Sequence, residues 1–302
     1  MKKILVIGGF GFIGSHLSKS YEQDGVEVFK TSRYFQILED DNSFQSDYSE
    51  LSFIELLENH NFDLIFYMSG NPYPQISEKN PIYDVQQTII PVVNLLNALV
   101  KTKFIGTLWY ASSVAVYGKT SHDFQSETDK CHPLSSYALA KITCEEYLKL
   151  FANHHNLSCG SLRIFSTFGE GLKRQIVYDL YQKAISDSPS LELIGTGKEQ
   201  RDLCYVSDQV ARIKILAQRL KPLGDIYNVG NGTYISTYDI AREVLNITNI
   251  YKTISVSNVV RDFDGFQWRA CTKKFSTIAD SPTTDFSVAL KNTIDSYRQD
   301  PN

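Results

Sequence analysis

The sequence predicts an α/β fold, namely a doubly wound parallel sheet followed by a smaller, mixed α/β lobe. Short apolar runs rich in β-branched residues, typical of buried parallel strands, alternate with stretches of helical periodicity. Alternation of this kind predicts βαβ units with right-handed crossovers around one sheet. The alternation loosens after residue 165. We therefore expect one domain over 1–165 and a second over 166–302, the two partly interleaved.

The individual elements follow from the same two periodicities. In the first domain we expect strands at 3–7, 26–30, 63–68, 105–111 and 159–165, and helices at 13–23, 50–59, 83–101 and 137–154. In the second domain we expect helices at 173–187, 207–219 and 236–245, with short strands between them.

Composition excludes several classes of protein. The chain has 302 residues, 21% of them charged, with a net charge of −4 and no basic stripe, which argues against nucleic acid or an anionic membrane as a partner. No segment approaches the roughly 20 apolar residues that span a bilayer. The five cysteines form no Cys-x-x-Cys pair and the six histidines no ligand spacing. We expect reduced thiols, no metal site and a cytoplasmic protein.

A glycine turn follows the first strand. Gly8, Gly11 and Gly14 have the spacing Gly-x-x-Gly-x-x-Gly and lead into a helical pattern. Strand, glycine turn and helix form the context of a Rossmann-type dinucleotide site, where glycines allow close approach of the backbone to pyrophosphate at a helix N-terminus. We therefore predict that this turn contacts a dinucleotide, together with Phe12 and Ile13 between its glycines.

A tyrosine and a lysine lie one helical turn apart in the sequence from Ser136 to Lys141. Residues at i and i+4 share a helix face, so the Lys141 amine is expected near the Tyr137 hydroxyl. A nearby positive charge lowers a tyrosine pKa, and a tyrosine tuned in this way exchanges protons with an alcohol or a carbonyl oxygen. The pair predicts acid–base chemistry. Read alone, it also fits a solvated helix face.

Two serines end the strand expected at 105–111. Ligands of open parallel sheets bind outside the carboxyl ends of the strands, so Ser112 and Ser113 are placed where chemistry is expected.

The end of the second strand indicates which cofactor is bound. NAD-preferring folds carry an acidic side chain there, whereas this chain has Thr31, Ser32 and Arg33. Because arginine pairs with a 2′-phosphate, we expect NADP (NADPH), with NAD as the alternative.

Taken together, these motifs resemble the extended short-chain dehydrogenase/reductases, in the branch of nucleotide-sugar epimerases, dehydratases and reductases. Four further segments match the family's motifs in order: 63–70, 162–171, 195–208 and 226–230. The resemblance implies that Tyr137 is the general acid/base and that Lys141 lowers its pKa and holds the nicotinamide ribose. It also implies that Ser113 hydrogen-bonds the reacting oxygen and that the smaller lobe, 166–302, binds the nucleotide-sugar substrate.

The resemblance implies further binding residues. Asp47 is expected to bind the adenine amino group, and other cofactor contacts are expected from Tyr48, Met68, Ser69, Gly70, Ala111, Ile164, Tyr137 and Lys141. Arg201 and Arg261 are candidates to clamp the diphosphate of a nucleoside-diphosphate sugar. The sugar itself is expected to contact Ser77, Ser112, Ser113 and Ser166, the last of which replaces the asparagine usual in relatives.

Several reactions within the family are compatible with these motifs. The 4,6-dehydratases carry an Asp-Glu pair where this chain has Val114 and Ala115, so we exclude that reaction. A reductase of the 4-keto group of a nucleoside-diphospho-4-keto-6-deoxyhexose, in deoxysugar and polysaccharide biosynthesis, is favoured because the strand-end acid is absent. A nucleotide-sugar 4-epimerase of the UDP-glucose or UDP-GlcNAc type stays open, as does a non-catalytic dinucleotide-binding protein.

The resemblance also implies a homodimer, because relatives pair through the helices expected at 83–101 and 137–154. The apolar residues of these helices (Val92, Val93, Leu95, Leu96, Leu148 and Phe151) fit a core-facing stripe equally well.

Overall fold

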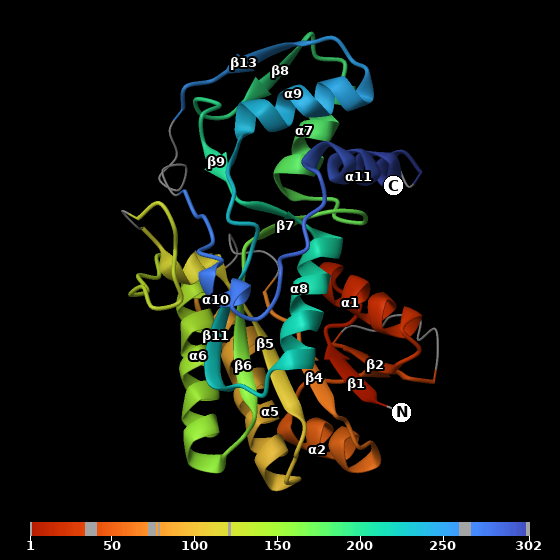
Figure 1. Cartoon of the computed structure of the whole chain (residues 1–302), viewed down its shortest axis with the longest axis vertical. Coiled ribbons are helices and arrows are strands. Elements are labelled where there is room, and N and C mark those ends of the chain that lie inside the picture. The colour runs from red at the N-terminus through yellow and green to blue at the C-terminus, as the bar shows by residue number, and fades with distance from the viewer. Residues whose placement is uncertain are drawn as a thin grey trace. The chain divides into compact units, whose positions relative to one another are not determined.

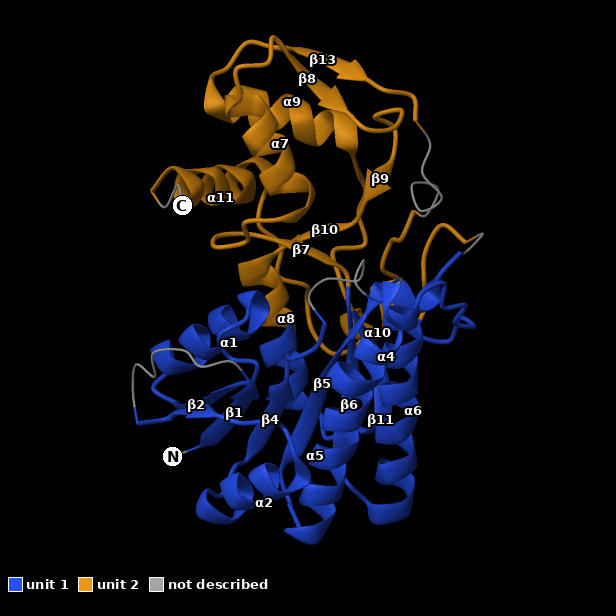
Figure 2. Cartoon of the chain, turned by 180° about the vertical axis from the view of Figure 1, so that it is seen from behind, with its two compact units in different colours: residues 1–119, 127–164, 213–228 blue, residues 120–126, 165–212, 229–302 orange. Residues whose placement is uncertain are grey.

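The structure is a computed structural model that describes residues 2–33, 41–71, 77, 79–119, 122–259 and 267–299. The chain forms two compact units (Figure 2). Unit 1 comprises residues 1–119, 127–164 and 213–228, and unit 2 comprises residues 120–126, 165–212 and 229–302. The domain division proposed from the sequence stays a prediction.

Unit 1 is built on a seven-stranded sheet with the order β11-β6-β5-β4-β1-β2-β3 (Figure 1). The strands are β1 (Lys3–Ile7), β2 (Glu27–Ser32), β3 (Ser43–Gln45), β4 (Leu64–Tyr67), β5 (Thr107–Ser113), β6 (Cys159–Ile164) and β11 (Leu223–Val229). Every neighbouring pair from β3 to β6 is parallel. The strand order reverses beside β1, which is the arrangement of a doubly wound fold.

Helices cover both faces of this sheet. They are α1 (Phe12–Gln23), α2 (Glu50–Asn59), α4 (Ile82–Asp84), the π-helical turn η1 (Val85–Ile89), α5 (Ile90–Lys101), the 3₁₀ turn η2 (Val114–Tyr117), α6 (Ser136–His155) and the part of α8 (Val206–Arg219) that follows residue 212. Helices α2, α5 and α6 pack on one face and α1 and α8 on the other (Figures 1 and 2). The predicted α/β fold is confirmed.

Local signals in the sequence set the ends of the helices. Ser49 caps α2 by accepting the Ser52 N–H at 3.2 Å, and Ser135 caps α6 by accepting the Ala138 N–H at 3.1 Å. At its other end α6 stops at Asn156, whose φ of 53° lies in the left-handed region that asparagine tolerates. The Ser135 cap fixes the first turn of α6, the turn that carries Tyr137.

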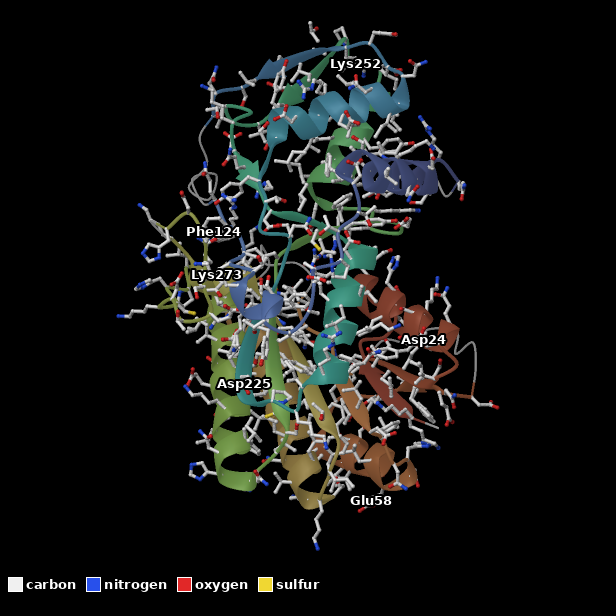
Figure 3. The ribbon with its side chains drawn as sticks, in the orientation of Figure 1. Asp24, Glu58, Phe124, Asp225, Lys252 and Lys273 are labelled. Atoms are coloured by element: carbon white, nitrogen blue, oxygen red, sulfur yellow. The ribbon has the colours of Figure 1, made fainter. Side chains whose placement is uncertain are left out.

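The apolar stripes of α5 and α6 supply much of the core of unit 1. Val92, Leu95, Leu96 and Leu148 are buried against the sheet, so the core-facing interpretation applies to these four. On the other face, the ammonium of Lys214 in α8 binds the Ser20 carbonyl at 3.0 Å and the Asp24 carboxylate at 2.7 Å. Asp24 is labelled just past the end of α1 in Figure 3.

Among its described residues, unit 2 contains three short strand pairs and several helices. The strands are β7 (Ser166–Phe168), β8 (Ser190–Leu193), β9 (Gln200–Arg201), β10 (Leu203–Tyr205), β12 (Ile235–Ser236) and β13 (Thr253–Val256). The helices are α7 (Gln175–Ile185), the start of α8, α9 (Thr237–Thr248), α10 (Lys273–Ser276) and α11 (Phe286–Gln299). Pairs β10–β7 and β13–β8 are parallel, and β12–β9 is antiparallel.

A buried carboxylate organises the loops of unit 2. Asp202 accepts the backbone N–H groups of Asn231 at 3.0 Å, Gly232 at 2.9 Å and Ala270 at 2.9 Å. Three charge-assisted bonds at one buried side chain hold these distant segments together.

Among the helices of the described residues, none is long and apolar enough to span a membrane.

Candidate active site

The glycine turn after β1 is built for close contacts. Gly8 has a φ of 81°, and a Cβ at this position would lie 2.8 Å from the Ser69 nitrogen. A Cβ at Gly14 would lie 2.2 Å from the Gly8 carbonyl oxygen, so only glycine lets α1 start this close to the strand. The turn thus brings the first strand, the first helix and the end of β4 together at one edge of the sheet.

The N-terminus of α1 fits an anionic group. Gly11 is its N-cap residue and supplies no side-chain hydrogen bond to the first turn. The first N–H groups of a helix have no intrahelical partner and carry the positive end of its dipole. Phe12 and Ile13, half-buried, form that first turn. A helix N-terminus of this kind fits the pyrophosphate of a dinucleotide.

Lys141 lies in the interior of unit 1 at the carboxyl end of β5. Its ammonium donates a hydrogen bond to the Ala111 carbonyl at 2.7 Å. The same nitrogen lies 4.8 Å from the centre of the Tyr110 ring and 5.8 Å from that of the Tyr137 ring. Burial lowers the pKa of Lys141 to about 8, because the charged form loses its hydration. The lysine therefore titrates near neutral pH.

Tyr137 and Ser113 flank this lysine in the fold. Tyr137 is half-buried in the first turn of α6, one helical turn before Lys141. Ser113 ends β5, is half-buried, and accepts the Ala115 N–H at 3.2 Å, which starts η2. Helix α6 packs against both β5 and η2. The three predicted catalytic residues thus come from adjoining elements at the carboxyl end of the central strand.

Ser112 has a different environment from Ser113. Successive residues of a strand point to opposite faces, and Ser112 is buried with its hydroxyl donating to Glu145. Arg163 donates to the same carboxylate through Nε at 3.1 Å and Nη2 at 2.7 Å. The structure thus gives Ser112 an internal partner, and its contact with substrate stays a prediction.

Glu145 and Arg163 were not singled out from the sequence. Two signals in the sequence could have found them. Glu145 follows Lys141 by four residues and so shares its helix face. Arg163 is a charged residue inside an otherwise apolar strand. A charge in a buried strand requires a buried partner.

The residues expected at the adenosine end of the cofactor differ in exposure. Thr31 and Tyr48 are buried and face each other, with 3.4 Å between their hydroxyl oxygens. Asp47 is exposed, and the backbone N–H of Ser49 lowers the pKa of its carboxyl by donating to it at 2.8 Å. Ser32 is half-buried.

Arg33 is held by residues of unit 1. Its guanidinium donates to the carbonyl of Gln87 at 3.3 Å and to the Gln87 side chain, and it lies 5.2 Å above the Tyr48 ring. A 2′-phosphate would therefore share this arginine with Gln87.

The remaining expected cofactor residues lie around the ends of β4, β5 and β6. Met68, Ser69, Gly70 and Ile164 are half-buried, and Ala111 is almost fully buried. A Cβ on Gly70 would lie 3.1 Å from the Lys141 ammonium, so the end of β4 adjoins the lysine.

Ser77 is fully buried in unit 1. It accepts a hydrogen bond from the Asn71 amide at 2.8 Å, and the same amide donates to Asp84 at 3.1 Å. Arg261 lies outside the described residues.

Unit 2 contains a pocket of about 380 Å³ between α7, β8 and β9. Two predicted substrate residues, Ser166 and Arg201, line it. Its other lining residues are Gln175, Ile176, Asp179, Leu180, Lys183, Leu193, Ile194, Glu199, Leu203 and Thr237. The α7 residues were not expected from the sequence, because no motif marks them. The lining mixes polar and apolar side chains, and its two acidic residues, Asp179 and Glu199, balance its two basic ones, Lys183 and Arg201.

Comparisons with known proteins identify the family of this chain. The model of the NAD dependent epimerase/dehydratase family matches residues 4–230. The dTDP-4-dehydro-6-deoxyglucose reductase of Escherichia coli is 28% identical over 247 residues, covering 77% of this chain and 78% of that protein. A putative UDP-glucose 4-epimerase of Methanocaldococcus jannaschii is 24% identical over 302 residues, covering 96% and 97%.

The fold is also that of solved relatives. The UDP-glucose 4-epimerase of Thermotoga maritima, solved with UDP-glucose, superposes with a TM-score of 0.89 at 23% identity and covers 99% of this chain and all of that one. The chain belongs to the NAD dependent epimerase/dehydratase family, and so to the extended short-chain dehydrogenase/reductases. The resemblance inferred from its motifs is confirmed.

Proposed function

We propose that this protein is an NADPH-dependent reductase of the 4-keto group of a nucleoside-diphospho-4-keto-6-deoxyhexose, acting in deoxysugar and polysaccharide biosynthesis. The observation that carries the proposal is the placement of Ser113, Tyr137 and Lys141 on adjoining elements beside the glycine turn. The similarity to the E. coli reductase supports the reaction class.

The residues of unit 1 fit a dinucleotide. Gly8, Gly11 and Gly14 would hold its pyrophosphate, and Lys141 its nicotinamide ribose. When bound, the reduced cofactor supplies a hydride to the sugar carbonyl.

Proton transfer is assigned to residues of this chain. Tyr137 protonates the oxygen that becomes the C4 hydroxyl, with Ser113 donating a hydrogen bond to the same oxygen. The Lys141 charge stabilises the negative charge that develops there and eases loss of the Tyr137 proton. Low exposure strengthens both effects, because water does not screen the ammonium.

The pocket of unit 2 is the proposed site for the nucleotide part of the substrate. Arg201 would bind the diphosphate, since a guanidinium fork matches phosphate oxygens, and Ser166 would contact the sugar. Arg261 is retained as a second candidate for the diphosphate.

NADPH is proposed because the end of β2 has no carboxylate. Ser32 and Arg33 together offer a hydroxyl and a guanidinium to a 2′-phosphate, which an acidic residue would repel.

We also propose a cytoplasmic homodimer. Exposed apolar side chains on the pairing helices, Ile90, Leu139 and Leu150, support the dimer, and light scattering at micromolar concentration tests it.

A 4-epimerase of UDP-glucose or UDP-GlcNAc is the second candidate. The hydrogen bonds from Arg33 to Gln87 favour it, because they engage the arginine on which NADPH preference depends. The relatives from M. jannaschii and T. maritima also bear epimerase names.

The decisive assay incubates the protein with dTDP-, GDP-, CDP- and UDP-4-keto-6-deoxyhexoses and NADPH. The reductase predicts loss of nicotinamide absorbance equal to the sugar consumed, with one nucleotide preferred. Interconversion of UDP-glucose and UDP-galactose without added coenzyme would establish the epimerase instead.

A further inference from the structure

Asp84, the last residue of α4, carries a buried carboxylate to which the proposed reaction gives no role. The residue is 1% exposed, and its Oδ1 accepts the Asn71 amide at 3.1 Å. Its Oδ2 is buried and has no hydrogen-bond partner in the part of the chain that the structure describes. A buried carboxylate with one oxygen unpaired is costly unless an opposite charge compensates it.

Lys141 is a buried cation that lacks an acidic hydrogen-bond partner among the described residues. Its ammonium has three N–H donors, and the acceptor found for it among the described residues is the neutral Ala111 carbonyl. The Tyr110 and Tyr137 rings add only partial negative charge. A buried cation in such surroundings needs a formal negative charge nearby to stay protonated.

Other acidic groups lie around Lys141. Glu145, on the same helix, also raises the pKa of Lys141, but it accepts two hydrogen bonds from Arg163, whose positive charge offsets part of its own. Burial raises the pKa of the Cys144 thiol to about 11 and that of the Tyr110 phenol further, so both are uncharged at neutral pH. Asp84 lies on the helix α4 that packs against α6, and its Oδ2 has no hydrogen-bond partner among the described residues.

We propose that Asp84 is the counter-ion of Lys141 and acts through it as a positioning residue for proton transfer. The inference rests on the proposed function, because it takes Lys141 as the residue that tunes Tyr137. The Asp84 charge opposes the effect of burial on the pKa of Lys141, which lies at about 8 with both acting. Without that charge, the pKa of Lys141 would be lower still.

The test follows the Lys141 amine by NMR in the intact protein with ¹³C-labelled lysine. Lys141→Met assigns the signal. Wild type is expected to titrate near pH 8, and Asp84→Asn, which keeps the shape but not the charge, at a lower pH. The matched control Asp84→Glu keeps the charge and should titrate close to wild type. Equal midpoints in wild type and Asp84→Asn would overturn the proposal.

A second readout separates this inference from the proposed reaction. In an active enzyme, the alkaline fall of kcat/KM should move to lower pH in Asp84→Asn by the same interval as the NMR midpoint. The NMR titration needs no turnover. Failure of every sugar substrate would therefore refute the reaction, and the NMR midpoints would still decide the role of Asp84.

If Asp84→Asn folds poorly, the double variant Asp84→Asn/Lys141→Met decides the question. A counter-ion predicts that removing both charges gives a higher midpoint of urea unfolding than removing Asp84 alone. A double variant no more stable than Asp84→Asn would overturn the proposal.

Discussion

In the described part of unit 1, two cations are buried, Lys141 and Arg163, and their surroundings stabilise the two charges in opposite ways. Each is 4% exposed. Arg163 forms two hydrogen bonds with the Glu145 carboxylate, and these outweigh the effect of burial, so that the pKa of Arg163 is raised. Lys141 binds a neutral carbonyl, and burial lowers its pKa to about 8.

The difference separates a structural charge from a reactive one. An ion paired with an opposite charge, such as Arg163 with Glu145, holds β6 against α6 and is lost only with its partner. The charged form of a buried ammonium with unused N–H donors is less stabilised, yet its charge can lower the pKa of a neighbouring phenol. The four predictions below probe this contrast, from the largest expected effect to the smallest.

Replacement of Tyr137 by phenylalanine should abolish proton transfer. We expect turnover to fall by about 10²- to 10⁴-fold, because that is the usual contribution of a positioned acid or base. Affinity for the dinucleotide, measured by fluorescence titration, should be retained. Tyr147→Phe, on the same helix α6, is the control and should leave turnover unchanged. Unchanged turnover in Tyr137→Phe would remove Tyr137 from the mechanism.

Replacement of Arg163 by methionine should destabilise the fold. The change leaves Glu145 buried without its partner, which typically costs about 3–5 kcal/mol in the free energy of unfolding. Urea denaturation followed by circular dichroism measures it. The double variant Arg163→Met/Glu145→Gln should recover much of the loss. A single variant as stable as wild type would mean that the pair is not structural.

The rate should depend on pH through Lys141. Its ammonium is present below its pKa of about 8 and lost above it, so kcat/KM should be level below that pH. Above it, kcat/KM should fall by about tenfold per unit. Lys141→Arg retains charge to much higher pH and should remove this alkaline fall in whatever activity remains. A fall of equal position in wild type and Lys141→Arg would assign it to another group.

The smallest effect is expected at Arg33. Arg33→Ala should weaken NADPH binding by about tenfold, the value of a charge-assisted hydrogen bond, and leave NADH binding unchanged. Equal loss for both coenzymes would place the arginine on the adenine ring, and no loss would favour NAD as the cofactor.

Much of unit 1 could be predicted from the sequence, because its signals are local. The turn from Gly8 to Gly14 needs glycine for steric reasons, and Ser135 and Asn156 mark the ends of α6. Helix periodicity alone places Tyr137 and Lys141 on one face of that helix.

Other features depend on contacts between distant segments. The partner of Ser112 is Glu145, 33 residues further along the chain, and strand alternation already indicates that Ser112 and Ser113 face opposite ways. Asp84 resembles any acidic residue of a polar helix start until folding buries it. The pocket of unit 2 draws on α7, whose sequence carries no motif.

Transfer of deuterium from labelled NADPH tests the central claim most directly. With NADPH deuterated at the transferred position and the preferred 4-keto sugar, we predict one deuterium at C4 of the product for each NADPH oxidised. In Tyr137→Phe, both the incorporation of deuterium and the oxidation of NADPH should be much slower. Conversion of a nucleotide-sugar to its 4-epimer, with no deuterium incorporated and no NADPH consumed, would contradict the account.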